Sequence, residues 1–509
     1  MNEAELSEEP ARRVSTGSSG LDTILNGGWI HGGTYMVTGA PGTGKTILGN
    51  QLCFSHVTGG GRAVFVTLLT ESHGRMMTHL QRMHFFRRDV IGQSLHYVSG
   101  YATLKSEGLE GLARLLYHSV REHHATVLVV DGLLPIQESA GSALVFREFL
   151  HSLGVHNALA GCTTLVLTNQ QESASDPQFA MVDGVLVLEM RLQGLKAVRA
   201  AEVTKLRGEP QLTGQHTFEI NDTGVCIHPR LEALYAHPPQ DTPEAGRRGF
   251  GLERLDEMMG GGVQPHSATM LFGPPGSGKT LLGLHFLEAG ARQGEPGLYF
   301  GFMETGPRLV AKAAGVGLEL LPWVQSGRLV LETRAAVEPL ADALAHELLG
   351  LVDRHRVRRL VIDGLEPLVQ ETMGTRRTAG FLTALTNALR SRGVTSLMTL
   401  QTNVLFGPRL EAKLEGLEAI VDNIVFLRYV ELRSQLYRML SILKMRESDY
   451  EPALRVFSIS SRGIDVAETF ESAEAILTGQ ARPLDVKKPK RSRRKKAERL
   501  MPSRRRSRA

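Results

Sequence analysis

Two glycine-rich segments of the sequence carry the residue pattern of a phosphate-binding loop. They read G-A-P-G-T-G-K-T from Gly39 to Thr46 and G-P-P-G-S-G-K-T from Gly273 to Thr280, 234 positions later. In such a loop the glycines let successive backbone N–H groups surround a phosphate, the lysine reaches the outer phosphates, and the last hydroxyl becomes a Mg²⁺ ligand. Two matches in similar contexts are difficult to attribute to chance. They indicate a protein that binds nucleoside triphosphates at two places, through Gly39, Gly42, Thr43, Gly44, Lys45 and Thr46 in the first loop and Gly273, Gly276, Ser277, Gly278, Lys279 and Thr280 in the second.

A magnesium site needs a second oxygen ligand beside each loop. Asp131 and Asp363 each end an apolar run, where a carboxylate can hold Mg²⁺ through water. The alternative is an aspartate at a strand end that only caps a turn. The spacing after each loop favours the magnesium role, with Thr46 and Thr280 as the hydroxyl ligands.

Hydrolysis also requires a carboxylate that orients the attacking water. The candidates are Glu71 and Glu304, which follow the short strand after each loop helix. Without gaps, Glu304 aligns with Thr70 and not with Glu71, so the two copies place their acids differently. Either glutamate could instead be a solvated loop residue. Polar residues after a further strand, Thr168-Asn169 and Gln401-Thr402, could sense the outer phosphate or simply form a turn.

Paired cations recur late in each half of the chain. Lys205 and Arg207, like Lys444 and Arg446, stand two positions apart, which places each pair on one face of a strand. Such cations often meet the charge on a transferring phosphoryl group, sometimes from a neighbouring subunit. A surface strand with two cations is the alternative, and the recurrence at similar distances from both loops favours the catalytic role.

The elements around these residues predict an α/β fold. Short apolar strands, such as Thr34–Thr38 and Ala268–Phe272, precede the loops, and helical patterns follow them, so each helix N-terminus adds to its phosphate site. Alternating strands and amphipathic stretches indicate a mostly parallel sheet flanked by helices.

Corresponding segments recur in the same order in both halves, which indicates a tandem duplication. We expect a first domain at 12–236, a polar and Pro-rich linker at 237–246 and a second domain at 247–480. Residues 1–11 should form a flexible N-terminus and 481–509 a basic disordered tail.

The charge of the chain is divided unevenly. Residues 487–509 carry a net charge of +12, against +5 for the whole chain, so the body has a net charge of −7. The tail could bind nucleic acid without sequence preference, attract an acidic partner, or have no dedicated partner. The sequence has no long apolar run and no signal pattern, and its three scattered cysteines read as small buried hydrophobes, so we expect a cytoplasmic protein away from membranes.

With these motifs in view, the sequence resembles the KaiC branch of the RecA superfamily. The resemblance rests on Thr16-Gly17-x-x-Gly20-Leu21-Asp22 ahead of a phosphate loop, the two copies, Lys205-Leu206-Arg207-Gly208, and Tyr429–Arg433 with Lys444–Arg446. It covers residues 12–480 and implies two tandem RecA-like domains and a six-membered ring with ATP between subunits. It also implies slow ATP hydrolysis with Mg²⁺, with the four cations acting on a neighbour's nucleotide.

The sequence departs from that family at two places. The family has two adjacent acidic residues after the second strand, where this chain has Leu69-Thr70 and Met303-Glu304. Its adjacent phosphorylated Ser and Thr align with Glu418 and Ala419, and 408–423 contains no Ser, Thr or Tyr. Glu418 supplies a fixed negative charge there, which suggests an interface held in one state.

The sequence therefore predicts an ATP-binding, slowly hydrolysing ring protein that signals through protein partners. Three alternatives stay open at this point: a serine/threonine kinase that acts on itself or a partner, a DNA-associated motor of the recombinase type, and a non-catalytic nucleotide-gated scaffold. The acidic body argues against the motor.

Overall fold

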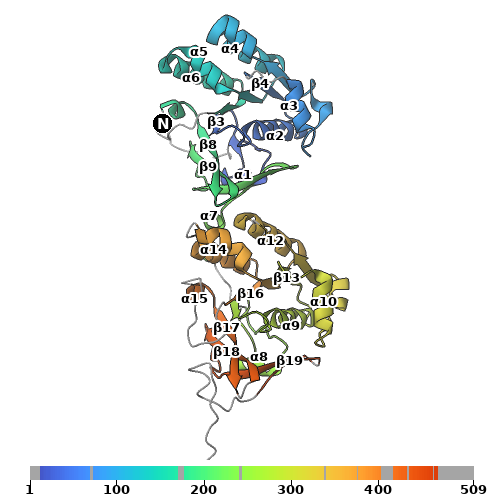
Figure 1. The fold of residues 1–509 in the computed structure, drawn as a ribbon. Coiled ribbons are helices and arrows are strands. Elements are labelled where there is room, and N and C mark those ends of the chain that lie inside the picture. The colour runs from blue at the N-terminus through green and yellow to red at the C-terminus, as the bar shows by residue number, and fades with distance from the viewer. Residues whose placement is uncertain are drawn as a thin grey trace, which may run out of the picture.

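The computed structural model describes residues 12–68, 73–169, 177–239, 244–337, 340–374, 377–402, 417–432, 435–446, 448–461 and 463–467. Two α/β domains follow one another along the chain and meet at a narrow waist that contains α7 (Leu231–Leu234) (Figure 1). Each domain is built on its own nine-stranded sheet.

The first sheet has the strand order β11-β10-β9-β8-β3-β7-β6-β4-β5. The six strands from β8 to β5 are parallel, and β9, β10 and β11 continue the sheet in antiparallel fashion. Its strands are β3 (Thr34–Gly39), β4 (Ala63–Thr67), β5 (Leu95–Ser99), β6 (Val127–Asp131), β7 (Thr163–Thr168), β8 (Gly184–Gln193), β9 (Lys196–Leu206), β10 (His216–Asn221) and β11 (Gly224–His228), and a separate ribbon pairs β1 (Arg13–Val14) with β2 (Trp29–Ile30).

Helices cover both faces of this sheet, as the near-continuous apolar strands require. Along β4, Ala63 and Phe65 pack with the apolar side of α2, whereas Val64 and Val66 pack in a second cluster with α4, α5 and α6. The period of two residues thus divides one strand between two cores. The helices are α1 (Ser19–Ile24), α2 (Lys45–Thr58), α3 (His73–Leu80), α4 (Tyr101–Glu122), α5 (Leu133–Ala140) and α6 (Ala143–Leu159), with short 3₁₀ turns η1 (Arg88–Val90) and η2 (Pro177–Met181).

The second sheet repeats this topology in the order β14-β13-β15-β16-β12-β17-β18-β19-β20. Its strands are β12 (Ala268–Gly273), β13 (Gly297–Gly301), β14 (Leu329–Thr333), β15 (Arg359–Asp363), β16 (Thr395–Gln401), β17 (Asn423–Leu432), β18 (Gln435–Met445), β19 (Arg455–Ser460) and β20 (Gly463–Val466). Its helices are α8 (Glu253–Met258), α9 (Lys279–Arg292), α10 (Gly306–Ala314), α11 (Leu321–Gln325), α12 (Ala341–His355), α13 (Glu366–Gly374), α14 (Thr378–Arg390) and α15 (Leu417–Ile420). The predicted fold class, two tandem domains with mostly parallel sheets flanked by helices, is confirmed.

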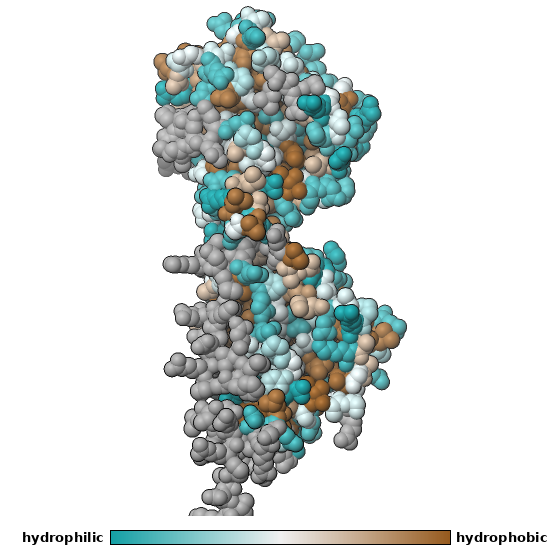
Figure 2. All heavy atoms as spheres, viewed as in Figure 1, coloured by the Kyte–Doolittle hydropathy of each residue, from teal (hydrophilic) through white to brown (hydrophobic). Residues whose placement is uncertain are grey.

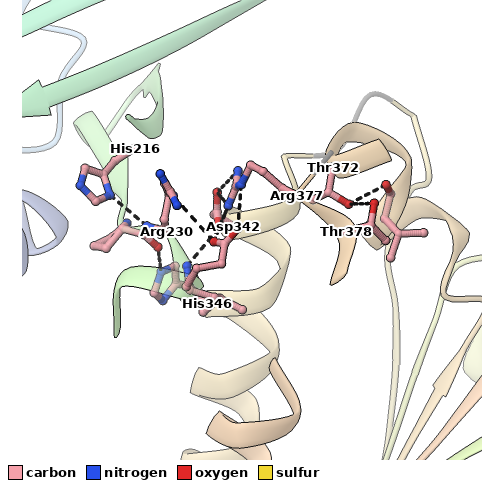
Figure 3. Close-up of polar contacts among 11 residues, drawn as sticks. His216, Arg230, Asp342, His346, Thr372, Arg377 and Thr378 are labelled. Atoms are coloured by element: carbon pink, nitrogen blue, oxygen red, sulfur yellow. Dashed lines mark hydrogen bonds and ion pairs between the residues drawn. The ribbon is translucent and has the colours of Figure 1, made fainter. Parts of the chain in front are cut away.

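The domains meet through a buried ionic cluster between α7 and the helices α12 and α14 (Figure 3). The Arg377 guanidinium, just before α14, donates to both carboxylate oxygens of Glu232 at 2.8 and 2.7 Å, and to Asp342 at 3.1 to 3.2 Å. Asp342 is fully buried and also accepts from the backbone N–H of Leu231 at 3.3 Å. Leu231 itself belongs to the core of the second domain, so α7 ties the two domains together.

Two histidines extend this junction toward the first domain (Figure 3). The Arg230 backbone N–H donates to the His216 ring at 3.0 Å, and the His346 ring on α12 donates to the Pro229 carbonyl at 2.6 Å. Burial lowers the pKa of His216, which keeps this ring a neutral acceptor near pH 7.

The surface combines hydrophilic areas with scattered apolar patches (Figure 2). No helix among the described residues has the length and apolar character needed to span a bilayer. Cys53 and Cys162 are buried as predicted, and burial raises the pKa of the Cys162 thiol to about 12. Cys226 is only partly buried, because it lies on β11 near the outer edge of the sheet.

Candidate nucleotide-binding sites

Each phosphate loop connects a buried strand to a helix, as predicted. β3 leads into α2 and β12 leads into α9, and both helices begin at the loop lysine. The residue before the lysine has a positive φ, 98° at Gly44 and 105° at Gly278. A Cβ would lie 2.7 Å from the Ile220 Cδ1 at the first position and 2.6 Å from the Phe457 Cε1 at the second. The positive φ therefore favours glycine at both positions, and the Phe457 ring leaves little space for a Cβ at the second.

The two loop lysines lie in matching positions. Each amino group donates to two carbonyl oxygens at the start of its own loop, at 2.7 and 2.9 Å. Burial lowers the pKa of Lys45 and Lys279, and the nearby carboxylates of Asp131, Asp363 and Glu366 oppose that shift. A nucleotide phosphate would supply the negative charge that such a partly desolvated ammonium lacks.

The predicted magnesium ligands come together in both domains. β6 ends at Asp131 and β15 ends at Asp363. The Thr46 hydroxyl donates to the Asp131 carboxylate at 2.8 Å, and the Thr280 hydroxyl donates to Asp363 at 2.9 Å. Oxygen ligands of this kind suit Mg²⁺, which binds one or two protein groups and keeps water in its remaining positions.

The second domain surrounds its aspartate with additional hydroxyl donors. Tyr299 donates to Asp363 at 2.7 Å and Thr399 donates to the other carboxylate oxygen at 2.8 Å. The strand registers place Phe65 and Leu167 at these two positions in the first domain. Burial, followed by the Asp363 charge, raises the pKa of Tyr299, so it stays a hydrogen-bond donor. The sequence analysis missed both donors because neither belongs to a recognised motif.

A cavity of 750 Å³ lies over the second loop, a volume suited to a nucleotide-sized ligand. Lys279, Thr280 and Asp363 line it together with the polar strand-end residues Gln401 and Thr402. The Thr402 hydroxyl and that of the loop serine are buried without a hydrogen-bond partner in the described structure. The Thr402 hydroxyl, which lies in the same lining as a lysine and an aspartate, fits a ligand with phosphate oxygens.

The predicted catalytic acids differ in what the structure says of them. Glu71 lies outside the described residues. Glu304 lines the cavity and accepts from the Lys312 amino group at 2.6 Å. A second carboxylate that the sequence analysis did not select, Glu366 at the start of α13, also lines the cavity and accepts from the Gln401 backbone N–H at 2.8 Å. Its only sequence signal is its position three residues after the strand-end aspartate.

The predicted cations do not reach the phosphate loop of their own domain. Lys205 pairs with the start of β8, which in turn lies beside the start of β3, whereas the loop follows the other end of β3. The length of β3, at about 3.3 Å per residue, therefore separates Lys205 from the phosphate loop by roughly 20 Å. Both Lys205 and Arg207 donate to carbonyls of 179–182, and Lys444 and Arg446 donate to carbonyls of 419–421.

Several predicted features lie outside the described residues. They are the N-terminal residues 1–11, the basic tail 481–509, the Leu69-Thr70 pair and the side chain of Glu418. Their proposed roles stay predictions.

The folds and sites described above define a tandem pair of P-loop domains of the RecA type. The KaiC ATPase family model matches residues 14–232 and again 249–471, and the chain therefore belongs to the KaiC family of ATPases. It is similar to the circadian clock oscillator protein KaiC of Rippkaea orientalis, with 26% identity over 493 residues that cover 93% of this chain and 92% of the relative. It is also similar to KaiC of Thermosynechococcus vestitus (26% over 499 residues, 95% and 94%) and KaiC 1 of a Synechocystis species (26% over 500 residues, 95% of each).

Proposed function

We propose that this chain binds ATP with Mg²⁺ in both domains and hydrolyses it slowly. The observation that carries the proposal is the contact between the loop threonine and the strand-end aspartate, 2.8 Å in the first domain and 2.9 Å in the second. It supplies the two oxygen ligands that a nucleotide-bound Mg²⁺ takes from a P-loop protein. The retained lysines supply the charge for the outer phosphates.

We assign the hydrolytic role to the second domain. Glu304 and Glu366 both line its cavity, as Asp363 does, and either carboxylate can orient a water molecule beside the terminal phosphate. The test is the rate of phosphate release by Glu304→Gln and Glu366→Gln, with the exposed Glu319→Gln as matched control. We expect one cavity variant to lose about 10²-fold or more in rate. Unchanged release in both cavity variants would remove the assignment.

The active assembly is proposed to be a homo-oligomeric ring, a hexamer, with ATP between subunits. Support comes from the position of the paired cations, which lie level with the starts of the parallel strands, whereas the phosphate loop of the same domain follows the other strand ends. From there Lys205, Arg207, Lys444 and Arg446 could act on a neighbour's nucleotide. Exposed apolar side chains on α6, among them Leu159 at 84% exposure, offer surface for such contacts. Figure 2 shows apolar spheres over this part of the first domain.

The proposed output is nucleotide-dependent binding of protein partners. The relatives are named circadian clock oscillator proteins. Residues 408–423 contain no Ser, Thr or Tyr, so a phosphorylation cycle on that segment is not open to this chain, and Glu418 provides a constant negative charge instead. A partner that co-purifies with the ATP-bound form and not with a nucleotide-free form would support this output. Equal recovery in both states would count against it.

A further inference from the structure

A second cavity, of 520 Å³, lies in the first domain at the far end of α2 from the phosphate loop. The N-terminal strand region, the end of α2 and the approaches to β4 and β6 form its walls. Nothing in the proposed nucleotide chemistry uses it. Its volume falls in the range of small-molecule sites, about 300 to 1,000 Å³.

The lining of this cavity is cationic. Arg12, Arg13 and Arg62 contribute guanidinium groups, His56 and His124 add imidazoles, and no carboxylate is among the lining residues. Arg13 is paired with a glutamate outside the lining at 3.0 Å. Arg12 and Arg62 are both exposed, and neither has a carboxylate partner in the part of the chain that the structure describes.

Burial and the nearby arginine disfavour the protonated form of the neighbouring histidines. Burial lowers the pKa of His56, and the positive charges of His31 and Arg12 lower it further. Burial and then Arg12 lower the pKa of His31 in the same way. The His56 ring holds its place through a 2.7 Å contact with the Thr126 hydroxyl. An anion in the cavity would offset the charges of Arg12 and Arg62.

The helix end alone does not explain the concentration of charge. Cations are favourable near the carbonyl groups of a last helical turn. Here the carbonyls of Ser55, His56 and Val57 already accept backbone N–H groups from 59–61. The guanidinium groups of Arg12 and Arg62 are therefore not needed to satisfy them.

The second domain provides an internal comparison at the same place. The spacing of 234 residues between the loops aligns Gly61 with Glu295. Glu295 accepts from Arg248 at 2.7 Å and from the fully buried Arg359 at 2.5 Å. Glu244 pairs with the same Arg248 and with a histidine. The second domain thus balances its cations with carboxylates.

The first domain lacks this carboxylate and also the two arginines that pair with it, and its own arginines here stand at other positions. A Cβ at Gly61 would lie 2.2 Å from the His56 Nε2, so His56 occupies the space in which a longer side chain would begin. Arg359 has no counterpart either, because the first residue of β6 is Val127. The two domains therefore differ here: the second has a paired ionic cluster and the first a cavity lined by arginines.

We propose that this cavity is a further ligand site, distinct from both nucleotide sites, that binds a small phosphate-bearing anion between Arg12 and Arg62. Guanidinium groups suit phosphate because their planar N–H donors match two oxygens at once. The Ser55 hydroxyl, which belongs to another lining residue, can donate to a remaining oxygen, whereas the Ser15 hydroxyl already donates to Asp22 at 2.6 Å. Occupation of this site would fix the N-terminal strand against the end of α2.

The test is calorimetric titration of the full chain with pyrophosphate and with inorganic phosphate at constant ionic strength. Both loops are first filled with a non-hydrolysable ATP analogue and Mg²⁺, and unbound analogue is removed. We expect saturable binding of pyrophosphate, weaker binding of phosphate, and a loss of about tenfold or more in affinity in Arg12→Gln/Arg62→Gln.

Arg82→Gln, another exposed arginine of the first domain, is the matched control and should bind as the unaltered chain does. Among the described residues neither Arg12 nor Arg62 has an ion pair, so the double variant should fold, which its melting temperature checks. The absence of saturable pyrophosphate binding would overturn the proposal. Equal affinity in the double variant and the unaltered chain would also overturn it, because the anion would then bind elsewhere.

Discussion

Replacement of Arg377 by Ala should destabilise the second domain and its junction with α7. In the structure this guanidinium makes two short bonds to Glu232 and further bonds to Asp342, whose side chain is fully buried. Its removal takes the cation from the fully buried Asp342 and leaves the partly buried Glu232 with only Arg230, 3.8 Å away, in the part of the chain that the structure describes. Loss of one partner from a buried ionic cluster costs about 3 to 5 kcal/mol of the free energy of unfolding.

The two tryptophans allow this loss to be assigned to a domain. Trp29 is buried in the first domain, and Trp323 lies on α11 in the second. Two variants are made, each of which keeps only one of the two tryptophans. Urea unfolding followed by tryptophan fluorescence then reports the unfolding of each domain separately. Arg377→Ala should lower the unfolding midpoint reported by Trp323 more than that reported by Trp29. Arg354→Ala, an exposed arginine on α12, is the control and should leave both midpoints unchanged.

The reasoning also predicts strong coupling within the cluster. The double variant Glu232→Ala/Arg377→Ala should lose less stability than the sum of the single variants, by about 1 kcal/mol or more. Additive losses, or a loss below about 1 kcal/mol in Arg377→Ala, would refute the view that this cluster carries the junction.

Three further predictions follow from the same structure. Burial alone would raise the pKa of Glu232, but the Arg377 bonds outweigh it and lower that pKa below its ordinary value of 4.5. The stabilisation is therefore present above pH 4.5 and is lost as the pH falls through the lowered pKa. At pH values below about 4.5 the urea midpoint reported by Trp323 should therefore decrease, and it should decrease less in Arg377→Ala. Tyr299→Phe removes a donor to Asp363 and should weaken Mg²⁺-dependent ATP binding in the second domain by about tenfold. The affinity is measured by Mg²⁺ titration in a Lys45→Ala background, and an unchanged affinity would mean that the hydroxyl has no role in ordering the carboxylate. Mixing Lys444→Ala subunits with Lys279→Ala subunits should restore part of the phosphate release. In a mixed ring the first variant supplies an intact loop and the second supplies an intact neighbouring cation. No restoration would contradict action between subunits.

Local sequence was sufficient to predict the strand–loop–helix arrangement around each glycine-rich segment and the strand-end position of the two aspartates. Glycine at positions 44 and 278 is favoured by positive φ, and a loop between a buried strand and a helix forms from adjacent residues. The fold class followed from the order of such units, because alternating strands and helices favour a parallel sheet. The paired cations were also visible, although only the sheet register shows that they lie away from their own loop.

The remaining features depend on contacts between distant residues. Tyr299 and Asp363 are 64 positions apart, and Glu232 and Arg377 are 145 apart. No periodicity links such residues, and each side chain alone reads as an ordinary core or surface residue. The cationic cavity was missed for the same reason, because it forms only where the N-terminal strand region meets the end of α2.

The fate of the terminal phosphate of ATP tests the central claim most directly. Purified chain is incubated with γ-labelled ATP and Mg²⁺, beside Lys45→Ala and Lys279→Ala. The account predicts that each single variant still binds labelled ATP through its intact loop. It also predicts slow release of free phosphate by the unaltered chain and loss of that release in Lys279→Ala. Label that stays on the polypeptide would instead identify a kinase, and label that stays on ATP in every sample would contradict hydrolysis by this chain.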